Sequence, residues 1–420
     1  MLLHLFGIVI LLICIYTVRH YCFTLNRVMG GQRHPYIDID TADWPAVTVL
    51  IAAHNEEAVI ADILRALMEV DYPQEKLAIV PVNDRSTDRT RAIIDEFVER
   101  YPHRITPFHR TGGKPGKAAA LKEAMSYVRT ELFLVFDADY IPGKALIRQL
   151  VAPFFDPEVG SVMGRVVPLN VGKKLLTRLL DLERSGGYQV DQQARMNLHF
   201  VPQYGGTVAG IRKDALDEVG GWNENTLAED TDLTFRLLMG GWKTVYENRA
   251  ECYEEVPERW PVRIRQIMRW AKGHNQAMVQ YAAALSHRKD VSWWERLDGL
   301  LLLGVYAMAP VLLLGWILAL LLFYTGAPIG GGVAVLGLAA FTTLGNFAAF
   351  FEIAAATRLD GSRIRIRLLP FTFLGFAVSL ISVSRAAWQQ TVALLLGQEM
   401  VWHKTERARI APVAVEGSSA

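Results

Sequence analysis

The stretch ELFLVFDAD (residues 131–139) is an apolar run that ends abruptly in two carboxylates, Asp137 and Asp139. Consecutive apolar residues are typical of a strand that is buried on both faces, as in a parallel sheet. Two like charges so close together repel each other unless a cation or a proton lies between them. The stretch therefore predicts a buried strand whose carboxyl end forms the floor of a polar site.

Two earlier stretches have the same form. AVTVLIAA (46–53) and LAIVPVN (77–83) are rich in β-branched and apolar residues, which indicates buried strands. A segment with helical periodicity follows each of them, at 60–67 and at RAIIDEFV (91–98), the second capped by a Ser or Thr of the preceding turn. This alternation predicts an α/β sheet with right-handed crossovers.

Polar side chains follow all three predicted strands. Asn55 and Glu56 follow the first strand, and Asp84 follows the second. Open α/β sheets bind their ligands at the carboxyl ends of the strands, so these side chains are expected to converge. Asp137 and Asp139 would hold a hard divalent cation such as Mg²⁺ or Mn²⁺, which accepts carboxylate and phosphate oxygens. A solvated turn is the alternative for these two carboxylates.

The composition divides the chain of 420 residues into unlike parts. It is 51% hydrophobic with a mean hydropathy of +0.18, but the apolar residues concentrate in 1–18 and in most of 299–395. A globular cytosolic domain inserted between membrane segments accounts for this division. The net charge of +1 gives no electrostatic case for nucleic acid. The three Cys form no spaced pair, so neither a disulfide framework nor a zinc site is indicated.

Residues 1–22 predict an N-terminal transmembrane helix. No Lys or Arg precedes the apolar core and no small-residue cleavage site follows it, which favours an anchor over a cleaved signal peptide. Arg19, Arg27 and Arg33 come after the core. By the positive-inside rule, the N-terminus lies outside and the next domain lies in the cytosol.

The C-terminal region, 299–397, contains about three apolar segments before a basic tail at 398–420. The segments are 299–324, 331–356 and 368–395. Three crossings would leave the tail outside, against the positive-inside rule. The third segment is therefore expected either to cross only in its first half or to be re-entrant. Asn346 and Glu352 in the second segment either line a polar path or hydrogen-bond to a neighbouring helix.

Two further stretches carry charges that could act on a ligand. GGKPGKAAAL (112–121) places Lys117 in a Gly-rich loop before a helix, where it could cradle phosphates or be a plain surface loop. It does not match the P-loop pattern. Glu229, Asp230 and Asp232 begin an apparent helix, where acidic residues often serve only the helix dipole.

The segment RQIMRWAKGH places Gln266, Arg269 and Trp270 within about one helical turn. A cation beside an aromatic ring could hold a phosphate and stack a sugar. An interfacial helix with snorkelling Arg and a Trp belt is the alternative. The basic, amphipathic segments 173–199 and 257–285 predict interfacial helices, which either frame a pore entrance or form a packing surface.

Taken together, these stretches resemble the membrane-embedded family 2 glycosyltransferases, whose relatives make cellulose, chitin, hyaluronan and poly-N-acetylglucosamine. The ordered motifs are IAAHNEE, VNDRSTD, GKPGKAAAL, FDAD, GGTVAGIRKDALDEVGGW, AED and QIMRW. The resemblance covers about 45–285 and implies a GT-A catalytic domain at 40–256, followed by the Q-x-x-R-W motif and interface helices at 257–298. The A-E-D replaces the T-E-D of many relatives. No F-x-V-T-x-K gating segment is seen, although VWHKT (401–405) could do a related job.

The resemblance also implies a role for each site residue. The residues expected to bind the nucleotide and donor are Ala53, Asn55, Glu57, Asp84, Lys117, Asp137, Gln266 and Arg269. Asp137 and Asp139 would hold Mg²⁺ or Mn²⁺ on the diphosphate, with Asp139 the more direct ligand. Asp230, beside Glu229, would be the general base of a single displacement that inverts the anomeric centre. Trp270 would bind the acceptor sugar.

The predicted activity is metal-dependent transfer from a UDP-sugar to a growing polysaccharide, processive and coupled to export, with an accessory membrane subunit as a further partner. The alternative is non-processive transfer to a lipid-linked acceptor in the bilayer, such as a polyprenyl phosphate or a sphingolipid. A transporter or receptor with a nucleotide-sensing domain is disfavoured by the combination of base and metal ligands. The predicted location is the plasma (inner) membrane, multi-pass, with the catalytic domain in the cytosol.

Overall fold

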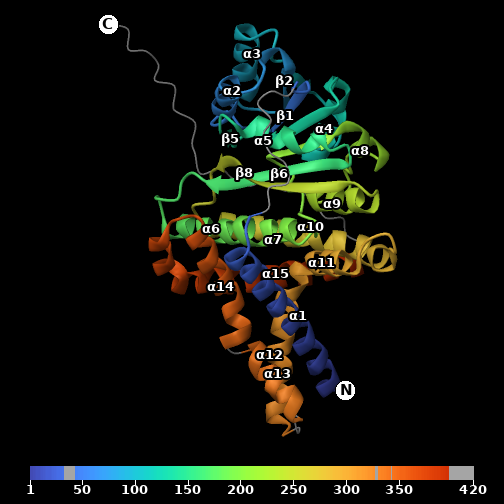
Figure 1. The fold of residues 1–420 in the computed structure, drawn as a ribbon, viewed down its shortest axis with the longest axis vertical. Coiled ribbons are helices and arrows are strands. Elements are labelled where there is room, and N and C mark those ends of the chain that lie inside the picture. The colour runs from blue at the N-terminus through green and yellow to red at the C-terminus, as the bar shows by residue number, and fades with distance from the viewer. Residues whose placement is uncertain (33–42, 327–329, 342, 397–420) are drawn as a thin grey trace.

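The computed structural model of the chain describes residues 1–32, 43–326, 330–341 and 343–396. Figure 1 shows three levels along the long axis of the molecule. One end of the molecule is an α/β unit, which contains the strands of the residues that the structure describes. A layer of helices lies beneath the sheet of this unit. A narrow helical stalk at the other end includes the N-terminus. The candidate site therefore has to be sought between a sheet and a helical layer.

The sheet has eight strands in the order β3-β2-β1-β4-β7-β6-β8-β5. They are β1 (Val47–Ala53), β2 (Leu77–Asp84), β3 (Phe108–Arg110), β4 (Leu132–Asp137), β5 (Ile141–Pro142), β6 (Val159–Pro168), β7 (Ala209–Arg212) and β8 (Lys243–Glu254). The first four strands are parallel to one another, which confirms the α/β arrangement predicted for three of them. The other half is mixed, because β7 runs antiparallel to both β4 and β6 whereas β8 pairs parallel with β6.

The helices of the α/β unit pack on both faces of this sheet. They are α2 (Ile60–Met68), α3 (Thr90–Arg100), α4 (Lys117–Ala124), α5 (Leu146–Val151), α8 (Lys213–Glu218) and α9 (Glu229–Met239), with short 3₁₀ turns η1 (Gln74–Lys76), η2 (Met125–Tyr127) and η3 (Ala152–Phe155). The apolar face predicted for the first helix is fully buried at Ile60, Ile63, Leu64 and Leu67. This burial in the main apolar cluster of the sheet is what fixes the helix, since its nine residues are too few to be stable alone.

The predicted Ser or Thr cap of α3 is wrong. Arg89 stands at the N-cap position, and the Asp88 carboxylate accepts the hydrogen bond from Thr90 N at 3.0 Å. The two candidate hydroxyls are engaged elsewhere: Ser86 Oγ accepts from Asn55 N, and Thr87 Oγ1 donates to Asn55 Oδ1. The hydroxyls thus join two loops instead of capping the helix.

The helical layer beneath the sheet, called the waist layer here, contains both segments predicted to be amphipathic. It comprises α6 (Leu175–Ser185), the π-helical turn η4 (Gly186–Gln192), α7 (Gln193–Asn197), α10 (Trp260–His287) and α11 (Trp293–Leu303). A closed ring of four ion pairs ties it to α1 (Leu2–Met29). Arg19 lies 2.9 Å from Asp191 and 2.8 Å from Asp298, and Arg195 lies 3.0 and 2.6 Å from the same two carboxylates.

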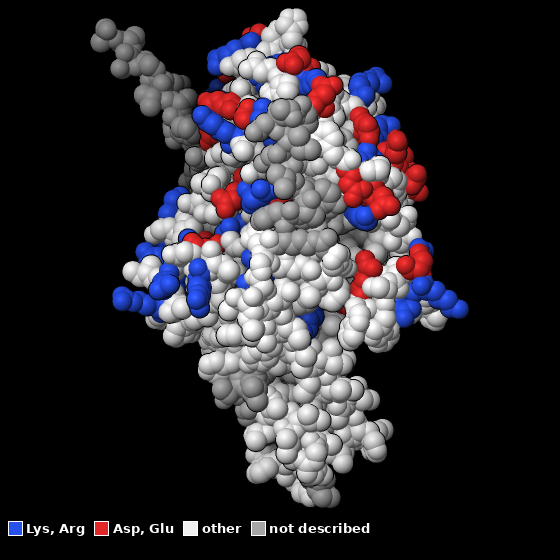
Figure 2. Space-filling view, in the orientation of Figure 1, with Lys and Arg blue, Asp and Glu red and all other residues white. Residues whose placement is uncertain are grey.

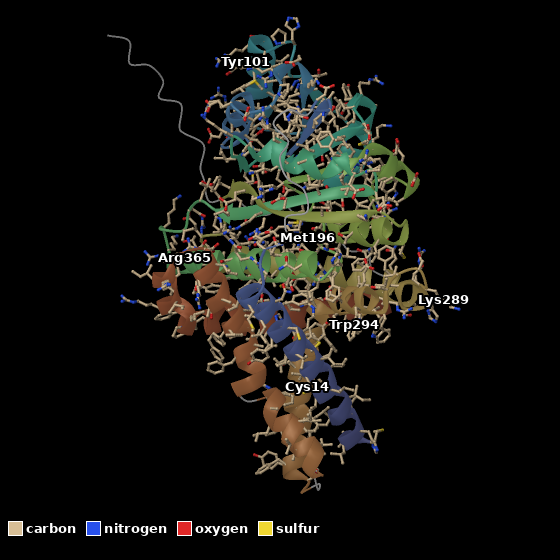
Figure 3. All side chains as sticks on the ribbon, viewed as in Figure 1. Cys14, Tyr101, Met196, Lys289, Trp294 and Arg365 are labelled. Atoms are coloured by element: carbon tan, nitrogen blue, oxygen red, sulfur yellow. The ribbon has the colours of Figure 1, made fainter. Side chains whose placement is uncertain are left out.

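The stalk is formed by the first half of α1, by η5 (Val305–Ala307) and α12 (Met308–Tyr324), and by α13 (Gly331–Phe341). Figure 2 shows that charged side chains are nearly absent from the stalk on this face and gather above it, at the waist. Arg365 and Lys289 mark the two sides of the waist (Figure 3). Within the described residues, three helices are long and apolar enough to cross a membrane: Leu2–Met29, Val305–Tyr324 and Arg363–Leu395.

In the second of the expected C-terminal segments, the described residues form α13 and a helix α14 (Thr343–Leu359), and α14 packs against α1 and the waist layer. After η6 (Arg363–Leu368), the long helix α15 (Leu369–Leu395) packs along α10 and α12 at the level of the waist layer (Figure 1). We include α15 in the waist layer.

Two polar predictions concern these segments. Glu352 hydrogen-bonds to His20 of α1, so it forms the expected helix–helix contact. The side chain of Asn346, the tail 398–420 and the VWHKT stretch within it lie outside the residues whose side chains the structure describes.

Candidate active site

The two carboxylates that end the opening stretch lie where the sheet meets the waist layer. Asp137 is the last residue of β4, and its amide donates to Thr207 Oγ1 at 3.0 Å. Its side chain is 32% exposed, whereas Asp139 is only 7% exposed. The strand end therefore presents one accessible and one nearly enclosed carboxylate.

Lys117, the first residue of α4, joins this strand end to α9. Its Nζ lies 2.6 Å from Asp137 Oδ1 and 3.8 Å from Glu229 Oε1, and it donates to the Gly206 carbonyl at 2.7 Å. Asp230 follows Glu229 in the first turn of α9. We call Lys117, Asp137, Glu229 and Asp230 the acidic cluster.

Burial dominates the electrostatics of the acidic cluster. Burial raises the pKa of Glu229 and of Asp230, and the Lys117 cation opposes the rise at both. Burial also lowers the pKa of Lys117, but the charges of Asp137 and Glu229 outweigh this and leave its pKa raised. Lys117 therefore stays charged, and Asp230 is a stronger proton acceptor than an exposed aspartate.

The orientation of Asp230 is fixed by its own helix and by a glycine. Its Oδ1 accepts hydrogen bonds from Thr231 N at 2.6 Å and Thr231 Oγ1 at 3.3 Å. Gly206 has φ +73°, and a Cβ there would lie 3.1 Å from Asp230 Cβ. Only glycine adopts this conformation at low cost and allows so close an approach.

Arg269 of α10 completes this part of the site. Its positive charge lowers the pKa of Asp230. Its Nε is buried and has no hydrogen-bond partner among the residues that the structure describes. A buried guanidinium nitrogen without a partner is costly, so this is a position at which an anionic ligand would be stabilised.

The other two residues of the Q-x-x-R-W motif face basic side chains of the waist layer. Gln266 Oε1 accepts from Arg263 Nη1 at 2.8 Å. The guanidinium carbons of Arg263 and Arg184 lie 5.2 and 5.3 Å from the centre of the Trp270 ring. Arg184 is held in turn by Glu254, which lies 2.7 Å from its Nε. Trp270 is thus presented among cations on the same helix as Arg269.

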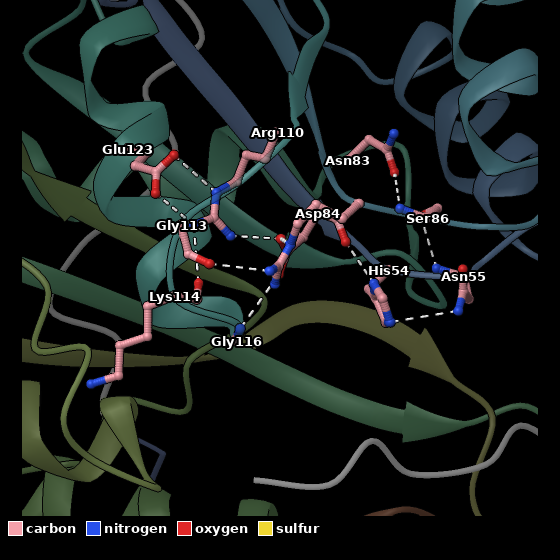
Figure 4. Close-up of polar contacts among 11 residues, drawn as sticks. His54, Asn55, Asn83, Asp84, Ser86, Arg110, Gly113, Lys114, Gly116 and Glu123 are labelled. Atoms are coloured by element: carbon pink, nitrogen blue, oxygen red, sulfur yellow. Dashed lines mark hydrogen bonds and ion pairs between the residues drawn. The ribbon is translucent and has the colours of Figure 1, made fainter. Parts of the chain in front are cut away.

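The remaining predicted residues lie at the end of β1, at the end of β2 and in the loop after β1, and Figure 4 shows Asn55 and Asp84 among them. The Asp84 carboxylate accepts from Arg110 Nη1 at 2.6 Å and from Arg85 Nε at 2.8 Å, and Gly116 N lies 3.4 Å from it. Gly116 immediately precedes Lys117, so Asp84 ties the Gly-rich loop to the end of β2. The two groups are therefore connected through a single loop.

Asn55 and Glu57 act on the neighbouring loop. Asn55 has φ +54°, and its Oδ1 accepts from Thr87 N at 2.7 Å. Glu57 Oε2 accepts from Arg89 N at 3.0 Å, and Ala53 is buried at the end of β1. These side chains shape the wall beside Asp84 by joining the loops that follow β1 and β2.

The donor set fits a metal that is shared with a ligand. Among the described residues, no three or more His, Cys, Asp and Glu side chains are grouped so as to hold an ion by themselves. Asp137 and Asp139 supply only carboxylate oxygens, and Mg²⁺ commonly takes one or two carboxylates together with waters and substrate phosphates. The 2.6 Å contact with Lys117 shows that Asp137 already attracts a cation.

Several residues around the site were not identified from the sequence. Arg110 is fully buried between Asp84 and Glu123, and His274 is buried against Thr231 with its Nε2 3.1 Å from Thr231 Oγ1. Burial lowers the pKa of His274 to about 4, so it is neutral near pH 7. Gly206, which lies against Asp230, carried a usable signal, as part of a Gly-Gly pair two residues before a strand.

Comparison with known proteins follows this geometry. A family model described as "Glycosyltransferase like family 2" matches residues 45–273. The chain is 34% identical over 268 residues to a probable glycosyltransferase, YdaM, of Bacillus subtilis (strain 168), covering 63% of this chain and 62% of that protein. It is 33% identical over 261 residues to a beta-monoglucosyldiacylglycerol synthase of Synechocystis sp., covering 62% of this chain and 54% of that protein. The chain thus spans less than two thirds of the length of these relatives.

Among solved structures, the chain is similar to the mannosyltransferase PcManGT from Pyrobaculum calidifontis, in complex with GDP-Man and Mn²⁺. The TM-score is 0.57 at 21% sequence identity, over 84% of this chain and 98% of that chain. This likeness shows the fold, which is a GT-A-like mixed α/β sheet.

Proposed function

Because the chain belongs to the family 2 glycosyltransferases, we propose that it transfers a single sugar, with inversion, from a nucleoside diphosphate sugar to a lipid acceptor at the membrane surface. One observation carries the proposal: Lys117 lies 2.6 Å from Asp137 and 3.8 Å from Glu229, the residue before Asp230, and the charge of Arg269 lowers the pKa of Asp230. Below the waist layer, the face of the stalk seen in Figure 2 carries almost no charged side chains, which supports a lipid as the acceptor.

The donor would lie across the ends of β1, β2 and β4. Asp84 and the loops joined by Asn55 and Glu57 would hold the base and ribose, and Lys117 and Arg269 would face the diphosphate. When bound between Asp137 and Asp139, Mg²⁺ or Mn²⁺ would neutralise negative charge that develops on the leaving diphosphate. The unpartnered Arg269 Nε supports the assignment of an anion to its end of the site.

Asp230 would act as the general base. The acceptor oxygen attacks the anomeric carbon from the face opposite the diphosphate, its proton passes to the Asp230 carboxylate, and the nucleoside diphosphate leaves. One base without a covalent intermediate gives inversion. The raised pKa of Asp230 supports this role, because a base with a pKa nearer to neutrality accepts a proton more readily.

The acceptor class is inferred from relatives and from position. The Synechocystis relative is named for a diacylglycerol-linked product, and the Bacillus subtilis relative is a glycosyltransferase without a stated acceptor. Trp270 lies on α10, a helix of the waist layer, below which the stalk begins (Figure 1). An acceptor hydroxyl on a lipid headgroup would therefore have a short way to travel to Asp230.

The test uses the full-length protein in vesicles with Mn²⁺ and radiolabelled UDP-glucose, UDP-N-acetylglucosamine or GDP-mannose. Label should enter the organic-solvent extract with one of these donors, and one sugar should be found per lipid. Asp230→Asn should abolish this transfer and leave binding of the donor nucleotide unchanged. Transfer that survives Asp230→Asn would refute the assignment of the base, and an unlabelled lipid extract with all three donors would refute lipid transfer.

A second candidate is the processive synthesis expected from the sequence. The observation that favours it is the Q-x-x-R-W motif, whose Gln266, Arg269 and Trp270 lie on α10 beside the acidic cluster. Size analysis of the labelled product separates the two functions. Ethanol-precipitable chains of many sugars would support a synthase, whereas a single sugar on an extractable lipid would support the proposed function.

A further inference from the structure

We propose that His274 of α10 is a positioning residue, which controls the hydrogen bond from the Thr231 hydroxyl to the Asp230 carboxylate. The inference rests on the proposed function, because it gives His274 a part in the work of the proposed base. His274 Nε2, Thr231 Oγ1 and Gln203 Nε2 lie 3.1 Å from one another in all three pairs. Asp230 Oδ1 lies 3.3 Å from the same hydroxyl oxygen. The hydroxyl therefore has two acceptors within reach and only one proton to donate.

The ring of His274 contributes one acceptor to this triangle. Burial lowers the pKa of His274 to about 4, and the charge of Arg195 lowers it further, so the ring is neutral near pH 7. A neutral imidazole has one bare nitrogen and one N–H. The amide nitrogen of Gln203 can only donate, so we assign Nε2 as the bare nitrogen and place the ring proton on Nδ1. Nδ1 is buried and has no hydrogen-bond partner among the described residues, so Nε2 carries the hydrogen bonding of the ring.

Two hydrogen-bond patterns satisfy this arrangement. In the first pattern, Gln203 donates to His274 and the Thr231 hydroxyl donates to the Asp230 carboxylate. In the second pattern, Gln203 donates to Thr231 Oγ1 and the hydroxyl donates to His274. Thr231 is fully buried, and a buried hydroxyl without a partner is costly. Because of His274, the hydroxyl can leave Asp230 and still be paired.

The two patterns correspond to the two protonation states of Asp230. A hydrogen bond to a carboxylate favours the charged form, so the first pattern is preferred while Asp230 is ionised. When the proton of the acceptor hydroxyl passes to Asp230, the carboxyl becomes a weaker acceptor and the Thr231 hydroxyl turns to His274. His274 itself gains and loses no proton. Its lone pair lowers the cost of proton uptake by the proposed base.

The charges around Asp230 do not provide this response. The groups whose charges interact with that of Asp230 are Lys117 of α4, Arg269 of α10, Glu229 of its own helix, and Tyr188, Tyr204 and Tyr306. The tyrosines are neutral near pH 7. The cations and Glu229 act on Asp230 in the same sense whichever way the hydroxyl points. The response to proton uptake therefore comes from Thr231 and its second acceptor.

Three substitutions test the inference in the full-length protein in vesicles. His274→Leu removes the lone pair, His274→Gln is the matched control with a side-chain oxygen that can take the place of Nε2, and Thr231→Val removes the hydroxyl. The protonation of Asp230 is titrated by the infrared band of its carboxyl group, identified by its loss in Asp230→Asn. The pH dependence of kcat for sugar transfer is measured on the same samples. Unchanged nucleotide affinity shows that a variant is folded, and His274→Asn, which is too short to reach Thr231, replaces His274→Leu if that variant does not fold.

The substitutions should move the titration in opposite directions. In His274→Leu the hydroxyl is committed to the carboxylate, so the infrared titration and the acid limb of kcat should move to lower pH by about half to one pH unit. The weaker base should also lower the plateau of kcat about threefold. Thr231→Val removes a hydrogen bond from the carboxylate and should move the titration to higher pH. His274→Gln should match the unaltered protein, and His274→Leu should have no further effect when Thr231→Val is also present.

An unchanged titration in His274→Leu, or a shift that persists in the double variant, would overturn the inference, since a loss of packing alone does not depend on the hydroxyl. Sugar transfer separates this inference from the proposed function. If the infrared titration moves as expected but Asp230→Asn still transfers sugar, the proposed base fails and the hydrogen-bond arrangement stands. If Asp230→Asn is inactive and the titration does not move in His274→Leu, the base stands and His274 has no part in its control.

Discussion

Replacing Gly206 by alanine should slow catalysis through the position of Asp230 alone. The new Cβ would lie 3.1 Å from Asp230 Cβ, whereas ordinary contacts of this kind begin at 3.4 Å. The carboxylate must therefore move by a few tenths of an ångström. Because a misplacement of about 1 Å costs a catalytic site about a hundredfold in rate, a shift of this size corresponds to roughly a fivefold to tenfold lower kcat.

The same substitution also strains the backbone, and a second variant separates the two effects. Gly206 has φ +73°, and a non-glycine residue in this region costs about 1–2 kcal/mol of folding free energy. Gly221 has φ +75° but no heavy atom within 4 Å of its added Cβ. Gly221→Ala thus carries the strain without the contact on Asp230.

The assay compares steady-state sugar transfer, nucleotide affinity and thermal unfolding for the two variants. Both should lose a similar amount of folding free energy and bind the donor nucleotide with unchanged affinity. Only Gly206→Ala should show the lower kcat. Equal kcat values for the two variants would refute the reasoning that the Gly206 contact positions the base, and a large loss of nucleotide affinity would show that the loop, not Asp230, had moved.

Three further predictions follow from the electrostatics of the described residues. Burial raises the pKa of Asp230, so kcat should fall as the pH drops through this raised pKa. Lys117→Met removes a cation that lowers the pKa of Asp230. This variant should therefore move the acid limb of the pH–rate profile to higher pH. Arg269→Met should weaken donor binding about tenfold to a hundredfold, as expected for the loss of a charge-assisted contact of about 1.5–3 kcal/mol, with Arg269→Lys intermediate in nucleotide titrations. Arg195→Met leaves the buried charge of Asp298 with only one ion-pair partner of the ring, Arg19. The free energy of unfolding, measured in urea, should fall by about 3–5 kcal/mol. The double variant that also carries Asp298→Asn should recover part of this loss.

The half of the fold around the parallel strands was predictable because local pattern and tertiary burial agree there. LFLVF, AVTVLIAA and LAIVPVN are apolar on both faces, and each lies in the sheet with both faces covered. The mixed half was not predictable in the same way. β6 and β8 carry polar residues such as Arg165, Glu247 and Glu251, and their pairing is decided by partners far away in the chain.

The membrane-side helices show a different limit of sequence reasoning. Hydropathy and length describe α15 as a helix that could cross a bilayer. These two quantities take no account of the side chain of Gln390 on α15. It accepts a hydrogen bond from Asn275 and donates one to the Lys272 carbonyl, and both contacts hold α15 against α10. A polar side chain that finds partners on a neighbouring helix changes where an apolar helix is most stable, and those partners are set by the fold.

The sequence named the candidate site residues but not the contacts that orient them. The end of a predicted strand pointed to Asp137 and Asp139, whereas the role of Asp230 was implied by the family resemblance. The support of Asp230 comes instead from Gln203, whose Nε2 donates to Thr231 Oγ1 at 3.1 Å and whose backbone exchanges hydrogen bonds of 3.0 Å with Gln192.

Gln192 ends the π-helical turn η4, directly after Asp191 of the ion-pair ring that holds Arg19 of α1. The orientation of Asp230 thus depends on a series of contacts that reaches the N-terminal apolar helix. Arg19 lies in the apolar helix α1, Asp191 and Gln192 lie in η4, and Gln203 lies in a loop. Taken singly, each is a polar residue that packing or solvation would explain without reference to the site. Their joint role follows only from the packing of α1 against the waist layer, and it gives a physical reason why an enzyme of this family would keep its catalytic unit and its apolar helices in one rigid arrangement.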